Sequence, residues 1–290
     1  MKKKPIRVLL LPDSPLWAFD NICNAIIKYN PYPDKIVYSK EFILHRPQVC
    51  YNDWDFVYIM FEGEKTVFNN KEKTVRGCYA QIWLESSLYS PEIIGTRFTE
   101  SRAVIFVNDI IEEIVIPFCE DIEHTVIEDS SDDEIFYPIP DKKQERFTAI
   151  FVGNPVRPIK NFPAIEEICK KADVDLLVAH KVPHNELVQC YNKSDICINY
   201  STSEGGPQTF VEAALCGVPM LIRSSNALSQ KIPCFTGMTK KGFIEHLLFL
   251  KENRGVCSAR GFSARDYVLQ HNTYKQTAKK FADFFLKLNK

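Results

Sequence analysis

The segment from Tyr191 to Pro219 constrains the fold more than any other part of the chain. An apolar run of strand length, Ile196–Tyr200, precedes a Gly-Gly-Pro turn at residues 205–207. Proline suits the first position of a helix, and Gly217 followed by Pro219 is typical of a helix end. The spacing therefore predicts a buried strand, a glycine turn and a helix, which together form the repeating unit of a parallel α/β sheet.

The same turn predicts an anion site beside two carboxylates. The first amides of a helix have no intrahelical partner, and the helix dipole is positive there, so phosphate binds favourably. Glu204 precedes the turn, and Glu212 lies eight residues later in the helix. Four other pairs of glutamates in the chain are also eight residues apart, so the spacing is informative only together with the turn. Carboxylates accept hydrogen bonds from sugar hydroxyls, so the pattern predicts a nucleotide-sugar site. An ordinary strand-turn-helix unit with a solvated glutamate fits the local pattern equally well.

Strand-like runs alternate with helical spacing in both halves of the chain, which indicates two parallel α/β sheets. A polar segment with two prolines, residues 131–145, separates the halves and is typical of a linker. The expected strands are Ile6–Leu11, Asp55–Met60, Tyr79–Glu85, Ala103–Asn108, Phe147–Gly153, Val174–His180, Ile196–Tyr200 and Met220–Arg223. The expected helices are Trp17–Tyr29, Asp109–Cys119, Phe162–Ala172, Pro183–Lys193, Lys241–Lys251 and Ser263–Leu288, with a loop or short helix over Pro91–Thr99.

Composition places the chain among soluble globular proteins. It has 290 residues, of which 45% are hydrophobic and 25% charged, enough for two domains with a sizeable core. The basic start is followed by an apolar run too short for a signal peptide, and no run is long enough to span a membrane. The ten cysteines are scattered without metal-ligand spacing. We therefore expect a cytoplasmic protein.

The small net charge of the chain conceals an asymmetry between its halves. Residues 1–140 carry 14 basic and 23 acidic side chains, whereas residues 141–290 carry 22 and 14. A positive second half suits a polyphosphate ligand. The acidic first half argues against nucleic acid or an anionic bilayer as the main partner.

Five stretches, in order, resemble the retaining glycosyltransferases of family 4, the group 1 glycosyl transferases. They are DSSDDEIFYPIP (129–140), VGNPVRPIKNF (152–162), VPHNELVQCYNKSD (182–195), SEGGPQTFVEAALCGVP (203–219) and ARDYVLQHNTYKQTAKKFADFF (264–285). The resemblance implies the α/β GT-B fold, in which two Rossmann-like domains have parallel sheets that face each other across a cleft. It implies a short N-terminal acceptor domain (1–140), a C-terminal nucleotide-sugar domain (141–270) and a C-terminal helix (271–290) that crosses back to the first domain.

The resemblance also implies roles for individual residues. Glu204 would contact the donor sugar and Lys160 would neutralise the departing diphosphate, so these two are the expected catalytic residues. Glu212 would hold the ribose. The other expected donor-binding residues are Gly205, Gly206, Pro207, Arg157 and Asn154. A fixed lysine supplies the required charge without a metal, so we expect neither a metal nor a cofactor.

Several positions depart from the family pattern. Asn154 stands where the family usually has arginine, and Arg157 reaches the same phosphates only if the loop curls differently. In the first half, Glu85 follows the third expected strand and is a candidate for the acceptor side of the cleft. Trp17 is a second such candidate, although simple packing is the favoured interpretation for that side chain.

The implied activity is transfer of a sugar, with retention, from a UDP- or GDP-type nucleotide sugar. The acceptor would be a glycan, a lipid-linked sugar or a protein. Two alternatives stay open. A non-catalytic nucleotide-sugar-binding or scaffold protein is favoured by the missing arginine at position 154. A nucleotide-sugar epimerase on the same fold would need an acid-base pair that the sequence does not reveal.

Overall fold

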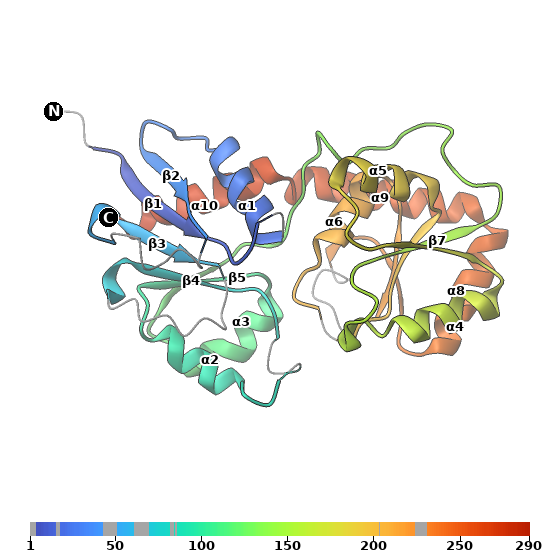
Figure 1. Cartoon of the computed structure of the whole chain (residues 1–290), viewed down its shortest axis with the longest axis horizontal. Coiled ribbons are helices and arrows are strands. Elements are labelled where there is room, and N and C mark those ends of the chain that lie inside the picture. The colour runs from blue at the N-terminus through green and yellow to red at the C-terminus, as the bar shows by residue number, and fades with distance from the viewer. Residues whose placement is uncertain are drawn as a thin grey trace. The chain divides into compact units, whose positions relative to one another are not determined.

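The computed structural model describes residues 4–15, 18–42, 51–60, 70–81, 84, 86–202, 204–223 and 231–290 (Figure 1). The chain divides into two compact units. The first unit comprises Met1–Asp129 together with Tyr274–Lys290, and the second unit comprises Ser130–Thr273. Each unit is built around a parallel sheet.

The sheet of the first unit has the strand order β2-β1-β3-β4-β5-β6 among the described residues. Its strands are β1 (Ile6–Leu11), β2 (Ile36–Lys40), β3 (Phe56–Ile59), β4 (Thr74–Cys78), β5 (Ala103–Phe106) and β6 (Glu123–Val126). Side chains alternate between the two faces of β1, so that Val8 and Leu10 join one apolar cluster while Leu9 and Leu11 join another. A strand buried on both faces explains the uninterrupted apolar run in the sequence.

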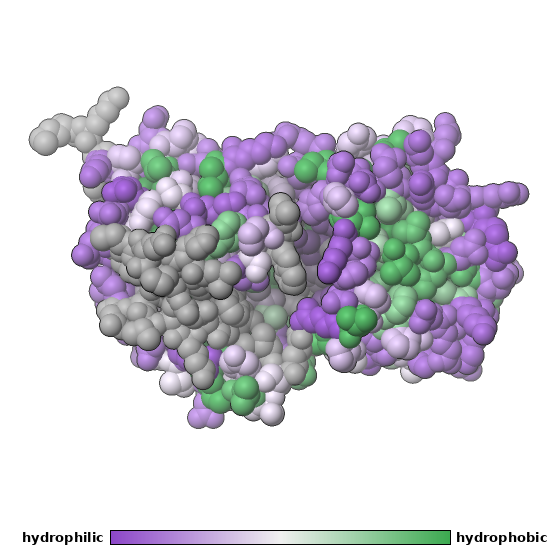
Figure 2. Space-filling view, in the orientation of Figure 1, coloured by the Kyte–Doolittle hydropathy of each residue, from purple (hydrophilic) through white to green (hydrophobic). Residues whose placement is uncertain are grey.

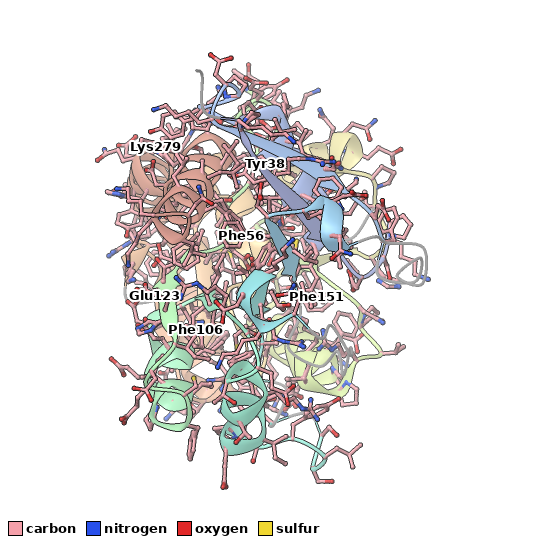
Figure 3. All side chains as sticks on the ribbon, turned by 90° about the vertical axis from the view of Figure 1, so that its left-hand side faces the viewer. Tyr38, Phe56, Phe106, Glu123, Phe151 and Lys279 are labelled. Atoms are coloured by element: carbon pink, nitrogen blue, oxygen red, sulfur yellow. The ribbon has the colours of Figure 1, made fainter. Side chains whose placement is uncertain are left out.

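The helices of the first unit come from both ends of the chain. They are α1 (Ala18–Lys28), α2 (Pro91–Phe98), α3 (Asp109–Val115) and α10 (Tyr274–Leu288). In α10, Phe285 is fully buried, with its ring centroid 5.6 Å from that of Phe56 on β3. The Phe56 ring thus packs on α10, whereas Lys279 is exposed on the outer side of that helix (Figure 3). The core of the first unit is therefore completed by a helix that follows the last strand of its sheet, β6, by more than 140 residues in the sequence.

The sheet of the second unit has the strand order β11-β10-β9-β7-β8. Its strands are β7 (Thr148–Val152), β8 (Asp175–Ala179), β9 (Ile196–Asn199), β10 (Met220–Arg223) and β11 (Phe235–Gly237). Strand β8 lies at the edge and leaves Val178 43% exposed. Figure 2 shows apolar surface gathered over the β7 region of this unit, amid otherwise hydrophilic surface.

Helices cover both faces of the second sheet. Helices α5 (His184–Lys193), α6 (Gln208–Leu215) and α9 (Arg254–His271) contribute to one apolar cluster. Helices α4 (Phe162–Ala172) and α8 (Lys240–Glu252) contribute to the other. The segment expected to be a linker is anchored in this unit by Phe136, which is 1% exposed and packs edge-on against the ring of Tyr191.

Three differences from the sequence expectations have clear physical causes. The third expected strand, Tyr79–Glu85, is replaced by β4, which begins five residues earlier. The sequence of β4 does not read as an apolar run because it contains Arg76, which is buried and donates to Ser101 Oγ at 3.1 Å. Strands β2, β6 and β11 escaped prediction because they are short and partly exposed, and lack an apolar run. The helix predicted over Ser263–Leu288 is interrupted at residues 272–273, where Thr273 forms a bridge with Ser131.

Truncation of Phe285 tests whether α10 belongs to the first unit energetically. The three tryptophans stand at positions 17, 54 and 83, so tryptophan fluorescence reports on the first unit. Phe285→Ala removes a fully buried ring and should destabilise this unit by roughly 3–5 kcal/mol. Urea unfolding followed by fluorescence should show the loss, whereas Lys280→Ala, at an exposed site on the same helix, should not. An unchanged urea midpoint in Phe285→Ala would contradict the packing.

Candidate functional site

The two loops of interest leave neighbouring strands at the carboxyl edge of the second sheet. Strand β7 pairs with β8 on one side and with β9 on the other, so the direction of the connections reverses between β7 and β9. Ligands of open α/β sheets bind at such a reversal, outside the carboxyl ends of the strands. The loop after β7 carries Lys160 and the loop after β9 carries Glu204. The amide of Thr202 donates to the carbonyl of Ile159 at 3.0 Å and joins the two loops.

Lys160 and Glu204 meet in a partly buried ion pair. The Lys160 ammonium donates to Glu204 Oε1 at 2.5 Å, and the two side chains are 14% and 13% exposed. Asn199 Nδ2 donates to the same carboxylate oxygen at 3.0 Å. Sequence reasoning assigned no role to Asn199, although a polar residue at the carboxyl end of a parallel strand is a signal that would have singled it out. The structure thus brings both expected catalytic residues into direct contact.

The backbone around Lys160 is shaped by two residues with positive φ. Gly153 follows β7 with φ of 149°, and its missing Cβ would lie 3.3 Å from the ring of Phe151. Asn161 has φ of 50° and separates the 3₁₀ turn Pro158–Lys160 from helix α4. Residues without a Cβ, and asparagine, adopt such conformations at the lowest cost. The loop therefore turns sharply on either side of the lysine.

Asn154 and Arg157 occupy the same loop as Lys160. Asn154 Oδ1 accepts a hydrogen bond from the amide of Val156 at 3.2 Å, and Asn154 carbonyl oxygen accepts one from the Arg157 amide at 3.3 Å. The side chain of Asn154 therefore stabilises the turn. Arg157 is exposed, at the surface of the loop that carries Lys160.

The Gly-Gly-Pro turn leads into α6 as predicted, with one difference in position. Gly205 and Gly206 are buried. Pro207 has extended backbone, with φ of −68° and ψ of 124°, so it precedes the helix, whereas the pattern had suggested the first helical position. Pro207, the residue before the helix, makes no side-chain hydrogen bond that would cap its first turn. The amino end of the helix thus presents backbone donors toward the loop that contains Glu204.

Helix α6 ends in a Schellman motif. Gly217 has φ of 69°, its amide donates to the carbonyl of Ala214 at 2.8 Å, and the next amide, from Val218, donates to Ala213 at 2.9 Å. Gly261 of helix α9 lies so close to Gly217 that an added Cβ would fall 2.1 Å from the Gly217 carbonyl oxygen. The glycine pair lets α9 pack directly against the end of the helix that carries Glu212.

Glu212 is buried, unlike Glu204, and has different partners. It is 3% exposed, and the Tyr191 hydroxyl donates to its Oε2 at 2.9 Å. His184 Nε2 lies 4.0 Å from its Oε1. Burial raises the pKa of Glu212 from its usual 4.5 to about 7, with the Tyr191 hydrogen bond acting in the opposite direction. Burial also lowers the pKa of His184, while the negative charge of Asp132 opposes that shift.

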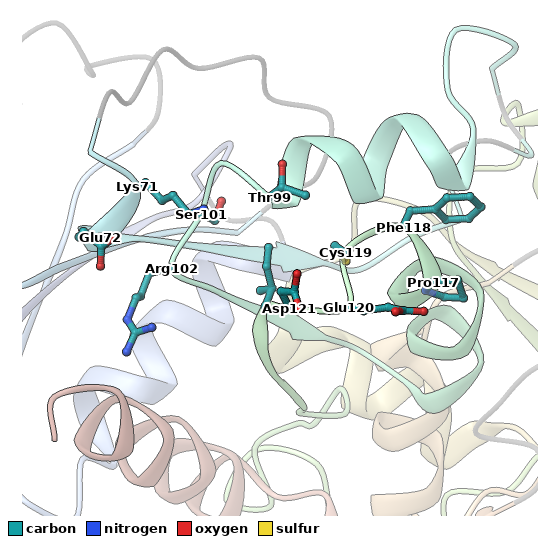
Figure 4. Close-up of a pocket in the computed structure, with 11 residues that line it drawn as sticks. Lys71, Glu72, Thr99, Ser101, Arg102, Pro117, Phe118, Cys119, Glu120 and Asp121 are labelled. Carbon is teal, nitrogen blue, oxygen red and sulfur yellow. The ribbon is translucent and has the colours of Figure 1, made fainter.

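The first unit contains the two remaining sequence candidates and a pocket. Trp17 and Glu85 fall outside the described residues. Figure 4 shows a pocket of about 430 Å³, lined by the segments that precede β4, β5 and β6. It therefore opens at the amino ends of these strands, the edge opposite to the one where α/β sheets bind their ligands.

Residues 145–283 match a family model described as "Glycosyl transferase-like". Just under half of the chain is thus similar to the glycosyl transferase-like family. The match spans the loops of Lys160 and Glu204 as well as helix α6, so the sequence resemblance is confirmed. The chain is a transferase, as predicted. Among curated proteins, no sequence relative matches the chain.

Solved structures place the glycosyltransferase chain in the GT-B fold. Sucrose-phosphate synthase from Thermosynechococcus elongatus aligns with a TM-score of 0.76 and 11% identity over 98% of this chain and 99% of the other. WaaG, a glycosyltransferase involved in lipopolysaccharide biosynthesis, aligns with a TM-score of 0.71 and 11% identity over 95% of this chain and 98% of the other. HepE from Anabaena, solved with UDP and glucose, aligns with a TM-score of 0.68 and 13% identity over 97% of this chain and 99% of the other. At these identities the likeness establishes the fold, and the predicted fold class is confirmed.

The described residues of the glycosyltransferase lack two features that would point to other kinds of site. No helix among them has the length and apolar character needed to cross a membrane. Within the same residues, no group of three or more His, Cys, Asp or Glu side chains is arranged to hold a metal ion.

The pKa of Glu212 makes a prediction about stability. An acid whose pKa is raised on folding binds its proton more tightly in the folded state. Stability therefore falls as pH rises from 4.5 through about 7, by roughly 3 kcal/mol at 1.36 kcal/mol per pKa unit. Glu212→Gln cannot ionise, so its stability relative to the wild type should increase between pH 5 and pH 8.

Urea unfolding at pH 5, 6, 7 and 8, followed by circular dichroism, measures this difference. Glu186→Gln is the matched control, because Glu186 is exposed on α5. Its stability relative to the wild type should not vary with pH. A constant difference for Glu212→Gln at all four pH values would show that Glu212 has an ordinary pKa.

Proposed function

We propose that this chain transfers a sugar from a nucleotide-diphosphate sugar to an acceptor, with retention and without a metal. The contact between Lys160 and Glu204 supports the proposal most strongly. It places a cation suited to a diphosphate beside a carboxylate suited to sugar hydroxyls, 2.5 Å apart between their polar atoms. It also lies where the strand order reverses, the position at which this class of sheet binds nucleotides.

In this proposal each part of the donor has its own protein partner. The diphosphate takes the Lys160 ammonium and the amides at the amino end of α6. The sugar hydroxyls take Glu204, and the ribose hydroxyls take Glu212. HepE was solved with UDP and glucose, so a UDP-linked sugar is the first donor to test and a GDP-linked sugar the second.

The electrostatics of the loops suit the bond-breaking step. When the bond between the anomeric carbon and the phosphate oxygen breaks, negative charge grows on the diphosphate and positive charge on the sugar ring. Lys160 neutralises the first, and Glu204 stabilises the second. Preorganised charges of this kind act strongly where water is largely excluded, and both side chains are less than 15% exposed.

The acceptor would bind to the first unit. The candidates are a glycan, a lipid-linked sugar or a protein, and Trp17 and Glu85 stay the sequence-based candidates for contacts with it. We further propose a cytoplasmic location, which the free cysteines of the described part of the chain favour.

A second function is favoured by one observation. Asn154 replaces the arginine usual in the resembled family, and its side chain is engaged with the Val156 amide. A protein that binds nucleotide sugars without turnover would tolerate this replacement. Release of free sugar from the donor in the absence of an acceptor separates this function from a glycosyltransferase.

The donor assignments predict different kinetic effects for the two glutamates. Glu212→Ala should mainly raise the KM for the donor, by roughly 10- to 100-fold, which corresponds to a charge-assisted hydrogen bond of about 1.5–3 kcal/mol. Glu204→Gln should lower kcat more than it raises KM, because the charge it removes matters most in the transition state.

Steady-state donor hydrolysis, with UDP-glucose tested first, measures both parameters. Lys160→Met should abolish turnover, whereas Lys170→Met, at an exposed site on α4, should behave like the wild type. Nucleotide-sugar binding without turnover in the wild type would favour the non-catalytic function. Unchanged kcat and KM in both glutamate variants would show that this site does not bind the donor.

Metal independence gives a separate test. If Lys160 supplies the charge opposite the diphosphate, EDTA should leave the hydrolysis rate unchanged, and added Mn²⁺ or Mg²⁺ should not increase it. Activity that EDTA abolishes and Mn²⁺ restores would show that a divalent cation takes part.

A further inference from the structure

The ammonium group proposed to bind the diphosphate is hydrogen-bonded to Glu204. The distance of 2.5 Å and the low exposure of both side chains indicate a strong pairing. A bound diphosphate would have to draw Lys160 at least partly away from this carboxylate. The inference that follows rests on the function proposed above. It concerns how the pair of Lys160 and Glu204 separates when a diphosphate binds.

We propose that Glu204 competes with the diphosphate for Lys160, and that Asn199 is a positioning residue that lowers the cost of releasing the lysine. Asn199 donates to Glu204 Oε1, the oxygen that also accepts from Lys160. When Lys160 turns to the diphosphate, the carboxylate keeps this hydrogen bond. Without it, a largely buried carboxylate would lose its protein donors among the described residues, which is costly.

The orientation of the Asn199 amide is set by its surroundings. Asn199 is the last residue of β9 and is 6% exposed. Its Oδ1 accepts a hydrogen bond from the amide of Ser201 at 2.9 Å. The backbone N–H requires the oxygen, so the NH₂ group faces Glu204. The side chain is thus held as a donor to the carboxylate by the strand that precedes the loop.

The competition has a consequence for the reaction cycle. While the donor is bound, its sugar occupies Glu204 and its diphosphate occupies Lys160. After transfer the sugar leaves with the acceptor, and Glu204 is again able to pair with Lys160. The nucleoside diphosphate then loses part of its binding energy, so the ion pair promotes release of this product.

UDP and GDP are suitable probes, because they carry the diphosphate but no sugar. Isothermal titration calorimetry at constant ionic strength should show that Glu204→Gln binds the nucleotide more tightly than the wild type, by about tenfold, which corresponds to roughly 1.4 kcal/mol. The same substitution should slow transfer. In a Lys160→Met background, Glu204→Gln should leave the affinity unchanged, since the competed group is absent.

Asn199 is tested by two substitutions. Asn199→Leu removes the donor at similar volume, and Asn199→Asp keeps the acceptor for Ser201 but places a like charge against Glu204. Both should weaken UDP binding, the aspartate more, by roughly three- to tenfold. In the Glu204→Gln background both losses should shrink, which a merely structural role would not produce. Asn185→Leu, at an exposed site on α5, is the control, and circular dichroism checks folding.

The outcomes separate this inference from the proposed function. If the wild type binds neither UDP nor GDP, the proposed function is wrong and this inference falls with it. If the wild type binds one of them but Glu204→Gln leaves the affinity unchanged or weakens it, the competition is wrong while the proposed function stands. If the tightening persists in the Lys160→Met background, Glu204 acts by general charge repulsion, and the competition for Lys160 is again wrong.

Discussion

The parallel pairing of β7 with β9 is the interaction on which the candidate site depends. The register places Ala149 opposite Ile196 and Ile150 opposite Cys197, so the two strands end at the same edge of the sheet. Their loops carry Lys160 and Glu204, which stand 44 residues apart in the sequence. Because the strands are parallel, the connections that return the chain are helices, and α6 points its amino end toward the same edge. One hydrogen-bonded strand pair thus assembles a cation, a carboxylate and a helix terminus.

Glu204 and Glu212, the two glutamates on either side of the glycine turn, show how the environment gives identical side chains different properties. Glu204 lies in a loop, with a lysine and an amide on one oxygen, so its charge is compensated by the protein. Glu212 is buried on α6 and accepts a hydrogen bond from the Tyr191 hydroxyl, and burial raises its pKa to about 7. One carboxylate thus lies in contact with a cation, and the other is poised to change its charge near neutral pH.

The first unit shows a different dependence on long-range contacts. Helix α10 supplies Phe281, Ala282, Phe284, Phe285 and Leu288 to a cluster whose other buried residues come from the first 129 positions. Tyr58 on β3 lies against both rings, with centroid distances of 5.5 and 6.2 Å. The first unit is therefore completed by the last segment of the chain, and its stability is linked to the packing of that segment.

Local sequence patterns were sufficient to predict the strands and turns that are marked by their own residue types. Buried central strands such as β1, β7 and β9 appear as uninterrupted apolar runs, and the glycine turn before α6 is marked by residue types that few other conformations favour. The segment Tyr191–Pro219 alone predicted the strand, the turn, the helix and both glutamates. Edge strands β2, β6 and β11 carry no such pattern, because partial exposure removes the need for apolar residues.

Contacts between distant residues could not be deduced in this way. Nothing local to Asn199 indicates that its amide faces Glu204, because that orientation depends on the Ser201 amide and on the pairing of β9 with β7. Likewise, the pKa of Glu212 depends on the helices and strands that bury it. The amino-acid sequence by itself determined the α/β class and singled out Glu204, the Gly-Gly-Pro turn and Glu212. Only the tertiary structure decided which of these residues meet and how deeply each is buried, because contact distance and burial depend on segments far apart in the chain.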